Sequence, residues 1–259
     1  MFGNKNRGEE ARKDTSWQKV SKWYGEIVGD KGHFFHQTVI LPKAMDLLEI
    51  KKDSRVLDIA CGQGVLSRSI DSSVEYVGVD WSKDLIKEAQ RRDKNVKHKY
   101  YTSDVTRDIP AKEKFDRAAI ILALQNIKEP QAALKNISHK LVPGARFLVV
   151  LNHPAFRIPR QSSWEEDKNQ KMQYRRINRY LTPLEIPINA HPGQTDSPVT
   201  WSYHHSLEDY SKFLFESGFL IERIEEWTSG KQSEGKAARQ ENRAREEFPM
   251  FMAILAIKK

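Results

Sequence analysis

The chain has 259 residues, of which 39% are hydrophobic and 30% are charged. This length and composition favour one large α/β domain and exclude a disordered chain. No run of about 20 apolar residues is present, and the N-terminus lacks the apolar core of a secretory signal, so we expect a soluble, cytoplasmic protein without a membrane span. Cys61 is the single cysteine, which excludes an internal disulfide and a zinc site built from several cysteines.

The charge balance is 43 Lys and Arg against 35 Asp and Glu, a net charge of +8. This excess is compatible with an anionic partner, including nucleic acid. Basic and acidic residues are intermixed, however, as in residues 230–247. The charge pattern therefore favours an ordinary solvated surface over a nucleic-acid footprint.

Apolar residues recur at helical spacing over Trp17–Val28 and from about His36 to Leu48. The spacing of apolar residues then changes. Arg55–Ala60 is typical of a buried strand, and a glycine-containing turn follows it. We expect a helix to open over Val65–Ile70. Strands and helices alternate after it, with strands at 76–79, 96–101, 115–122 and 146–151 and helices at 83–92 and 130–141. This alternation predicts βαβ units and a largely parallel sheet.

Residues 154–200 interrupt this rhythm with many aromatic and basic residues, and we expect a lid or substrate-binding insertion with a short helix near Lys168–Arg179. The α/β pattern resumes where Ser206 can cap a helix that runs through Phe215. We expect a strand at 219–224, a solvated and mobile segment at 228–244, and a final antiparallel strand at 248–257.

The turn that follows the strand at 55–60 is a candidate cradle for a small ligand. Gly62 and Gly64 let a ligand approach the backbone, and a helix N-terminus after them would offer free N–H groups. Asp80 stands at the end of the next strand, where a carboxylate can accept two hydrogen bonds from a ribose diol. Ser67 replaces the third glycine of a dinucleotide fingerprint, and Asp58 would repel a pyrophosphate but tolerate a cationic amine.

Asp58–Gly64 (Asp-Ile-Ala-Cys-Gly-Gln-Gly) resembles motif I of the class I S-adenosylmethionine-dependent methyltransferases. Further landmarks of that family occur in order. Asp80 matches the ribose-binding acid, Asp104 matches the acid that holds the adenine amino group, and Phe115–Ile127 is similar to the fourth-strand motif. Leu141–Ala145 is similar to the Leu-x-Pro-Gly-Gly turn, with alanine for the second glycine. The match covers about residues 15–152 and the last two strands, and it is closest to small-molecule and quinone-type methyltransferases.

The resemblance implies a Rossmann-like, seven-stranded, mostly parallel sheet with helices on both faces and an antiparallel last strand. It divides the chain into an N-terminal helical cap (residues 1–50) and a methyltransferase domain (residues 51–259) that carries the insertion at about 154–200. The implied cofactor is S-adenosyl-L-methionine. Its implied contacts come from Tyr24, Asp58, Ala60, Cys61, Gly62, Gly64, Asp80, Trp81, Ser82, Asp104, Val105 and Leu122.

Simpler interpretations stand beside several of these roles. Cys61 is equally typical of a small buried residue that lines the turn. Asp104 can be a turn residue and Asp80 a helix cap. The aromatic residues of the N-terminal helices can serve only to pack those helices onto the sheet.

The sequence offers His153 as the best candidate for a general base, because residues at the carboxyl end of a parallel strand face the ligand crevice. A loop hydrogen bond is the alternative role for this ring. His204 and His205 are a second possibility. No carboxylate stands at metal-ligand spacing from these histidines, so we expect no metal site. The candidate substrate contacts are His36, Gln125, Arg157, Tyr174 and His204.

The predicted reaction is in-line transfer of a methyl group to a small-molecule acceptor. The basic insertion could clamp a carboxylate or phosphate, or it could dock RNA, so a tRNA methyltransferase is the main alternative. A non-catalytic interaction module is a third hypothesis. Methylation at pyrimidine C5 is excluded, because the only thiol lies in the cofactor turn. Methylation of DNA amino groups is disfavoured, since residues 122–125 lack the Asn/Asp-Pro-Pro-aromatic motif.

Overall fold

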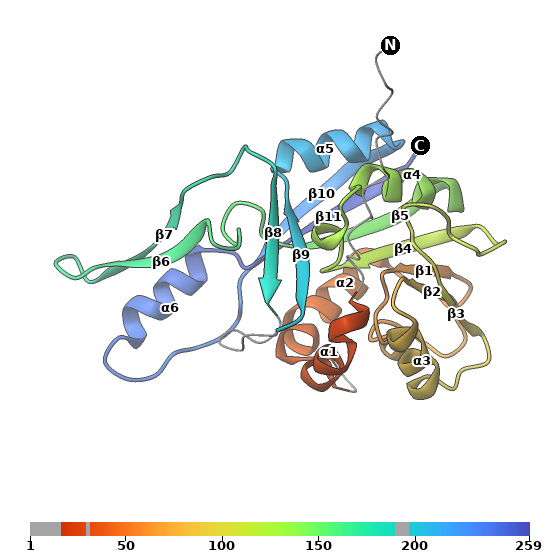
Figure 1. Cartoon of the computed structure of the whole chain (residues 1–259), viewed down its shortest axis with the longest axis horizontal. Helices are drawn as coiled ribbons and strands as arrows, with labels where there is room; N and C mark the ends of the chain where they lie inside the picture. The colour runs from red at the N-terminus through yellow and green to blue at the C-terminus, as the bar shows by residue number, and fades with distance from the viewer. Residues whose placement is uncertain (1–16, 30–31, 190–196) are drawn as a thin grey trace, which may run out of the picture.

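A seven-stranded sheet crosses the molecule, with helices packed on both of its faces (Figure 1). The structure is a computed structural model that describes residues 17–29, 32–189 and 197–259. Within residues 17–28, the side chains outside the described part are those of Lys19, Lys22, Tyr24, Glu26 and Ile27. In these described ranges no helix combines the length and the apolar character needed to cross a bilayer.

The strand order is β10-β11-β5-β4-β1-β2-β3. Strands β1 to β5 pair in parallel, and β11 lies antiparallel between β5 and β10. This arrangement confirms the predicted Rossmann-like sheet and its antiparallel last strand. The strands are β1 (Arg55–Ile59), β2 (Glu75–Asp80), β3 (His98–Thr102), β4 (Phe115–Ile121), β5 (Leu141–Asn152), β10 (Phe219–Trp227) and β11 (Phe251–Lys258).

Alternation along the central strands buries both faces of the sheet. In β5, Phe147 and Val149 join the core beneath α4 and α5, whereas Leu148 and Val150 join the core beneath α2. Such strands read as continuous apolar runs because neither face meets water. The helices and helical turns are η1 (Gln18–Val20), α1 (Ser21–Val28), η2 (His36–Ile40, a π-helical turn), α2 (Leu41–Leu48), η3 (Ser67–Ser69), α3 (Lys83–Arg92), η4 (Leu124–Asn126), α4 (Pro130–Lys140), α5 (Leu207–Glu216) and α6 (Ala238–Glu247).

Side-chain caps fix the starts of two predicted helices. The Ser82 hydroxyl accepts a hydrogen bond from the Leu85 amide at the start of α3. At the start of α5, Ser206 and Asp209 form a reciprocal capping box. Both helices are confirmed within a residue of the predicted bounds, because local capping chemistry sets their ends.

Three predicted segments differ in the structure. Val65–Ile70 is a turn that contains only the short η3, so no helix N-terminus faces the cradle. Residues 168–179 form no helix; most of them belong to a β-hairpin made by β6 (Ser162–Asp167) and β7 (Met172–Ile177). The segment predicted to be solvated and mobile contains much of α6, which packs against β7.

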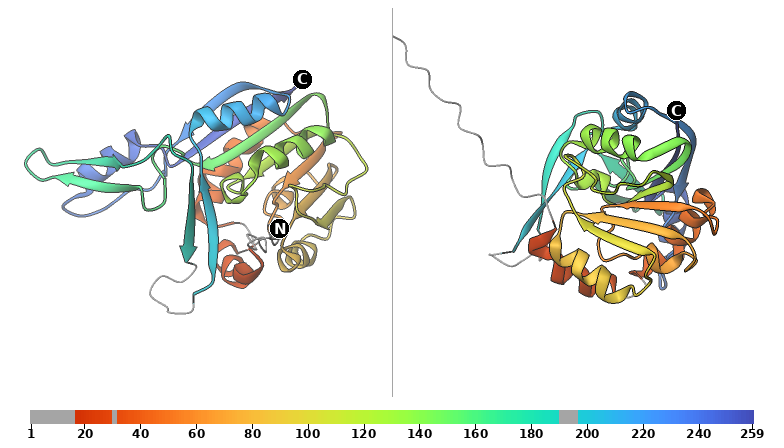
Figure 2. Two further views of the ribbon diagram at one scale, coloured as in Figure 1. Left: turned by 45° about the horizontal axis from the view of Figure 1, so that its top comes forward. Right: turned by 90° about the vertical axis from the view of Figure 1, so that its right-hand side faces the viewer.

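The β6–β7 hairpin and α6 together form an arm that projects from one end of the sheet (Figures 1 and 2). A second hairpin, β8 (Leu184–Asn189) with β9 (Val199–His204), lies between this arm and α1. Both hairpins therefore come from residues 154–204, which leave the sheet after β5 and return to it through α5.

Candidate cofactor and acceptor site

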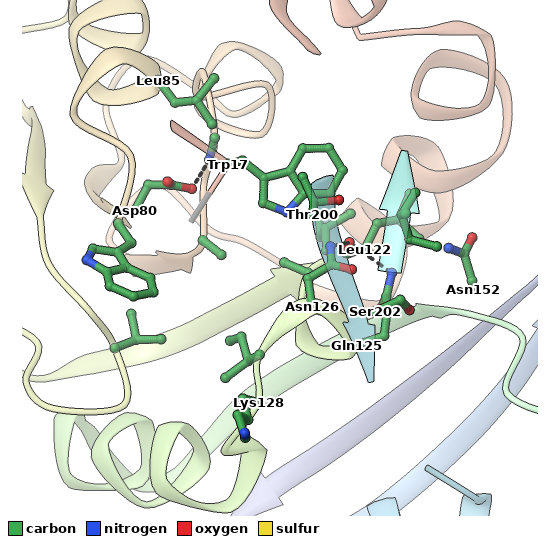
Figure 3. Close-up of a pocket in the computed structure, with 18 of the residues that line it drawn as sticks. Trp17, Asp80, Leu85, Leu122, Gln125, Asn126, Lys128, Asn152, Thr200 and Ser202 are labelled. Atoms are coloured by element: carbon green, nitrogen blue, oxygen red, sulfur yellow. Dashed lines mark hydrogen bonds between the residues drawn. The ribbon is translucent and has the colours of Figure 1, made fainter. Parts of the chain in front are cut away.

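A cavity of about 1070 Å³ opens at the carboxyl ends of the central parallel strands (Figure 3). Ala60 and Gly62 follow β1, Asp80 ends β2, Leu122 follows β4 and Asn152 ends β5, and all five line it. Ligands of open α/β sheets bind at this edge, because the loops between strand and helix diverge there. We call this space the main cavity.

The loop after β1 has a conformation that ordinary residues avoid. Ala60, Gly62 and Gly64 all have positive φ angles, of 54°, 55° and 73°. A Cβ on Gly64 would lie 3.0 Å from the Tyr100 hydroxyl, so this position accepts only glycine without a shift. Left-handed backbone at Ala60 costs about 1–2 kcal/mol. Leu122, at the matching end of β4, also has a φ of 54°, so two strained non-glycine residues flank the cavity.

Asp80 is a buried carboxylate at the edge of the main cavity. Its Oδ2 accepts the Gly62 amide at 2.9 Å and its Oδ1 accepts the Ser82 amide at 2.8 Å. Burial raises its pKa, and these backbone donors oppose that effect. Each oxygen keeps a further lone pair, and Figure 3 shows the carboxylate among the cavity side chains. The group can therefore accept hydrogen bonds from a ligand while it holds the loop in place.

Four residues predicted to contact the cofactor lie outside the lining. They are Asp58, Cys61, Gly64 and Ser82. The Asp58 carboxylate is buried and accepts the Tyr76 hydroxyl at 2.7 Å. Burial, with an added contribution from the Asp80 charge, raises the pKa of Asp58 to about 7. Burial also raises the pKa of the Cys61 thiol, so it stays protonated. These residues support the loop from behind.

The remaining predicted cofactor residues form the walls of the main cavity. Trp81, Asp104, Val105 and Leu122 line it, together with Ala60, Gly62 and Asp80. Oδ1 of Asp104 accepts the amide and the hydroxyl of Thr106, which fixes the loop after β3. The side chain of Tyr24 lies outside the described residues.

His36 and Gln125, both predicted to contact substrate, face the main cavity. Burial, followed by the neighbouring His33, lowers the pKa of His36 to about 4, so its ring is neutral at neutral pH. Nδ1 of His36 and Oε1 of Gln125 are buried and have no hydrogen-bond partner among the described residues. Buried polar atoms usually have a partner, so these two residues each carry an unsatisfied group beside the main cavity.

His153, predicted as the general base, lies outside the lining of the main cavity, and its base role stays a prediction. Its Nδ1 accepts the amides of Ala155 and Phe156 at 3.2 and 3.3 Å. Nε2 therefore carries the proton and lies 2.6 Å from Oε1 of Glu226. In this arrangement the ring has no free lone pair for a substrate proton, and it holds the loop after β5.

Two further predicted substrate contacts lie elsewhere. Nε2 of His204 lies 2.6 Å from the Tyr180 carbonyl and is outside the cavity lining. Tyr174 is exposed on β7 in the arm. Arg157 does line the main cavity, as predicted. His204 and Tyr174 were predicted from residue type alone. The segments that surround them are distant in the sequence, so no local pattern indicates these neighbours.

Several lining residues escaped the sequence analysis. The most informative are Thr200 and Ser202, which share one face of β9 and approach Gln125 and Leu122 in Figure 3. Their spacing of two residues is typical of a strand. The sequence does not indicate, however, which face of this hairpin lines the cavity, because the hairpin lies outside the main sheet. Other residues of this kind are Trp17, Asn126, Asn152, Glu185, Ile188, Met250 and Phe251.

The described residues fit a sulfonium nucleoside. The left-handed loop admits a close backbone approach, and Asp80 can receive a sugar diol. The side chains of His36 and Gln125 line the part of the cavity that remains for the reacting end. A neutral His36 adds no positive charge that would repel a sulfonium.

The comparisons with known proteins agree with this geometry. Residues 56–144 match the family model described as a methyltransferase domain. The chain is 28% identical over 145 residues to a demethylmenaquinone methyltransferase of Staphylococcus carnosus strain TM300, a match that covers 54% of this chain and 60% of the relative. The chain thus spans less than two thirds of that relative.

Solved structures extend the likeness in fold. An S-adenosylmethionine-dependent methyltransferase from Mesorhizobium loti superposes with a TM-score of 0.65 at 22% identity, over 84% of this chain and 96% of that one. The glycopeptide N-methyltransferase MtfA, solved in complex with S-adenosylmethionine, gives a TM-score of 0.56 at 16% identity, over 84% and 92% of the two chains.

Proposed function

We propose that the chain is a class I S-adenosylmethionine-dependent methyltransferase that transfers a methyl group by in-line displacement to a small-molecule acceptor. The observation that carries this proposal is the main cavity at the carboxyl ends of β1, β2, β4 and β5, with Asp80 at its edge. The cavity is large enough for a nucleoside cofactor and an acceptor together, since ligand pockets commonly span 300–1,000 Å³.

Bound S-adenosylmethionine supplies a methyl group that is already activated by its positive sulfur. The protein's own residues need only bind, align and desolvate the two reactants. Asp80 and the loop at 60–64 hold the nucleoside end in this proposal. His36 and Gln125 orient the reacting end, while Phe251 and Leu122 exclude water.

A base is needed only for an acceptor that is protonated at neutral pH. His36 is the lining histidine with a buried, unpartnered ring nitrogen. Its low pKa of about 4 makes it a hydrogen-bond acceptor rather than a strong base. The proposal therefore assigns His36 to orientation of the acceptor, in place of the base role predicted for His153.

The small-molecule acceptor is supported by the named demethylmenaquinone methyltransferase relative and by the cavity itself. The relatives and structures named above give no support to the RNA alternative. The division into a cap at 1–50 and a domain at 51–259, and the cytoplasmic location, stay predictions.

Titration calorimetry with S-adenosylmethionine tests this function. The wild-type chain should bind the cofactor, and Asp80→Asn should weaken binding about tenfold or more, because a charge-assisted hydrogen bond contributes about 1.5–3 kcal/mol. Asp108→Asn is the matched control, because it removes the same charge from an exposed loop outside the main cavity. Absence of cofactor binding by the wild-type chain, or equal affinities in wild type and Asp80→Asn, would contradict the proposal.

A further inference from the structure

A second, smaller cavity adjoins the main cavity at the base of the arm. Its volume is about 270 Å³, and Phe35, Arg157 and Met250 line both cavities. Its other walls come from the loop after β5, from β6 and β7, and from α6 with the segment before β11. We call it the arm pocket. The two cavities are therefore neighbours, and the Arg157 side chain stands at their junction.

The arm pocket is lined by cations and contains no carboxylate among its described lining residues. The basic side chains are Arg157, Arg175, Lys231 and Arg245. Of these, Arg245 has an acidic partner, Glu241, at 3.5 Å within α6. Lys231 lies over the rings of Phe34 and Phe35 instead. Like charges gathered without counter-charges destabilise the empty pocket, and an anion would remove that repulsion.

Arg157 is the strongest single pointer to a ligand. Its guanidinium makes no hydrogen bond or ion pair to any described residue, and the side chain is half-buried between the two cavities. Desolvation lowers the pKa of Arg157, and desolvation followed by the charge of Arg157 lowers the pKa of Arg175. A partly desolvated charge gains from an ionic partner, and a guanidinium matches carboxylate and phosphate in geometry.

Arg175 is already held in position for such a ligand. Its Nε donates to the Phe156 carbonyl at 2.8 Å and its Nη2 donates to the Ser162 hydroxyl at 3.0 Å. Its guanidinium lies 5.0 Å from the Trp164 ring. These contacts fix the second cation near the first without neutralising it, which is pre-organisation for an anion rather than a structural ion pair.

Aromatic rings complete the arm pocket. Phe156 and Trp164 each lie edge-to-face with Phe248, at 5.4 and 5.5 Å between ring centroids. Phe35 lies on the side of the arm pocket that it shares with the main cavity. An apolar frame around desolvated cations strengthens their attraction for an anion, because the local dielectric is low.

We propose that the methyl acceptor carries an anionic group, a carboxylate or a phosphate, which Arg157 and Arg175 bind in the arm pocket while the acceptor atom lies in the main cavity. This proposal rests on the proposed function and names the substrate class of the same site. It also gives the arm a role, since the β6–β7 hairpin and α6 supply Arg175, Trp164 and Arg245 to the pocket. Arg157 is then a specificity-determining residue at the junction of the two cavities.

The test measures binding of simple probes to the full chain in the presence of saturating S-adenosylhomocysteine. Phenyl phosphate and benzoate present the two anion chemistries, benzyl alcohol is the neutral analogue, and inorganic phosphate lacks the acceptor body. At least one aromatic anion should bind, and its affinity should fall as salt is raised. Arg157→Gln should weaken this binding at least tenfold. Arg179→Gln is the control, because it removes one exposed positive charge outside both cavities and should change the affinity less than twofold.

The outcomes separate this inference from the proposed function. Equal binding of an aromatic anion by Arg157→Gln and Arg179→Gln would overturn the inference, as would benzyl alcohol binding as tightly as the anions. Inorganic phosphate binding as tightly as phenyl phosphate would also overturn it, since the site would then hold a free anion. Loss of S-adenosylmethionine affinity in Arg157→Gln would reassign this residue to the cofactor's carboxylate. A wild-type chain that binds no cofactor at all contradicts the proposed function instead.

Discussion

The charged side chains at the two ends of the main cavity differ in whether the fold supplies them with hydrogen-bond partners. At the β2 and β3 end, Asp80 accepts the amides of Gly62 and Ser82, and Asp104 accepts the amide of Thr106. At the β5 end, the half-buried Arg157 guanidinium has no hydrogen-bond or ion-pair partner among the described residues. The acid end is therefore satisfied by the fold before any ligand arrives, whereas the basic end depends on a ligand for its counter-charge. Three measurements test this contrast.

The largest effect is expected from Asp58→Asn, behind the acid end. Burial raises the pKa of Asp58 to about 7, so the folded chain holds a proton that the unfolded chain releases near pH 4. Protonation thus stabilises the fold at low pH, and this contribution is lost as pH rises towards about 7. Relative to Asp58→Asn, the wild-type free energy of unfolding should fall by about 1.4 kcal/mol per pH unit between pH 5 and 7.

Urea unfolding of both chains at pH 5, 6, 7 and 8 measures that difference. Asparagine keeps an oxygen for the Tyr76 hydroxyl, so the comparison isolates the titrating proton. If the difference in unfolding free energy between the two chains does not change with pH, Asp58 does not hold an extra proton in the folded state.

Gly78→Ala should have the next largest effect. A Cβ at this position would lie 2.9 Å from both Cys61 Sγ and Tyr100 Cδ1. Overpacking of a buried strand costs about 2–3 kcal/mol and would displace the cofactor loop, so both the thermal midpoint and S-adenosylmethionine affinity should fall. In Gly25→Ala, within α1, the new Cβ meets only an ordinary contact at 3.6 Å, so this control should leave affinity unchanged and should not lower the thermal midpoint, because Ala favours a helix more than Gly does. Retained affinity in Gly78→Ala would mean that the loop tolerates displacement.

The smallest effect concerns His153, beside the basic end. His153→Ala removes the acceptor for the Ala155 and Phe156 amides, and these bonds are long, so the free energy of unfolding should fall by about 1–2 kcal/mol. Cofactor affinity should stay the same, because the ring does not line the main cavity. The exposed His139→Ala is the control for loss of an imidazole. Unchanged stability together with loss of methyl transfer would support the base role.

The acid end could be predicted from the sequence because its signals are local. Asp58–Gly64 encodes a strand and a tight turn, and Asp80 ends the next strand of the same βαβ unit. The failure at Val65–Ile70 is also local in origin. The Ser67 hydroxyl donates to the Gly64 carbonyl at 2.8 Å and the Ser69 hydroxyl donates to the Val65 carbonyl, so the backbone groups of this segment are satisfied without a full helix.

The basic end could not be predicted in the same way, because its walls meet from distant parts of the chain. Residues 168–177 have helix-compatible side chains, and what decides their conformation is pairing with β6 and packing of β7 on α6. The position of His153 at a strand end was right, but Glu226 at the end of β10 binds its ring. No local pattern places those two residues together.

Phe35 is one of three residues that line both cavities. Its ring lies 5.5 Å from that of Phe251, and Lys231 lies 4.9 Å from its centroid. A ligand that fixes this ring from one side also fixes a wall of the space on the other side. Any coupling that this ring transmits between ligands in the two cavities must be reciprocal, so that each ligand changes the affinity for the other by the same factor.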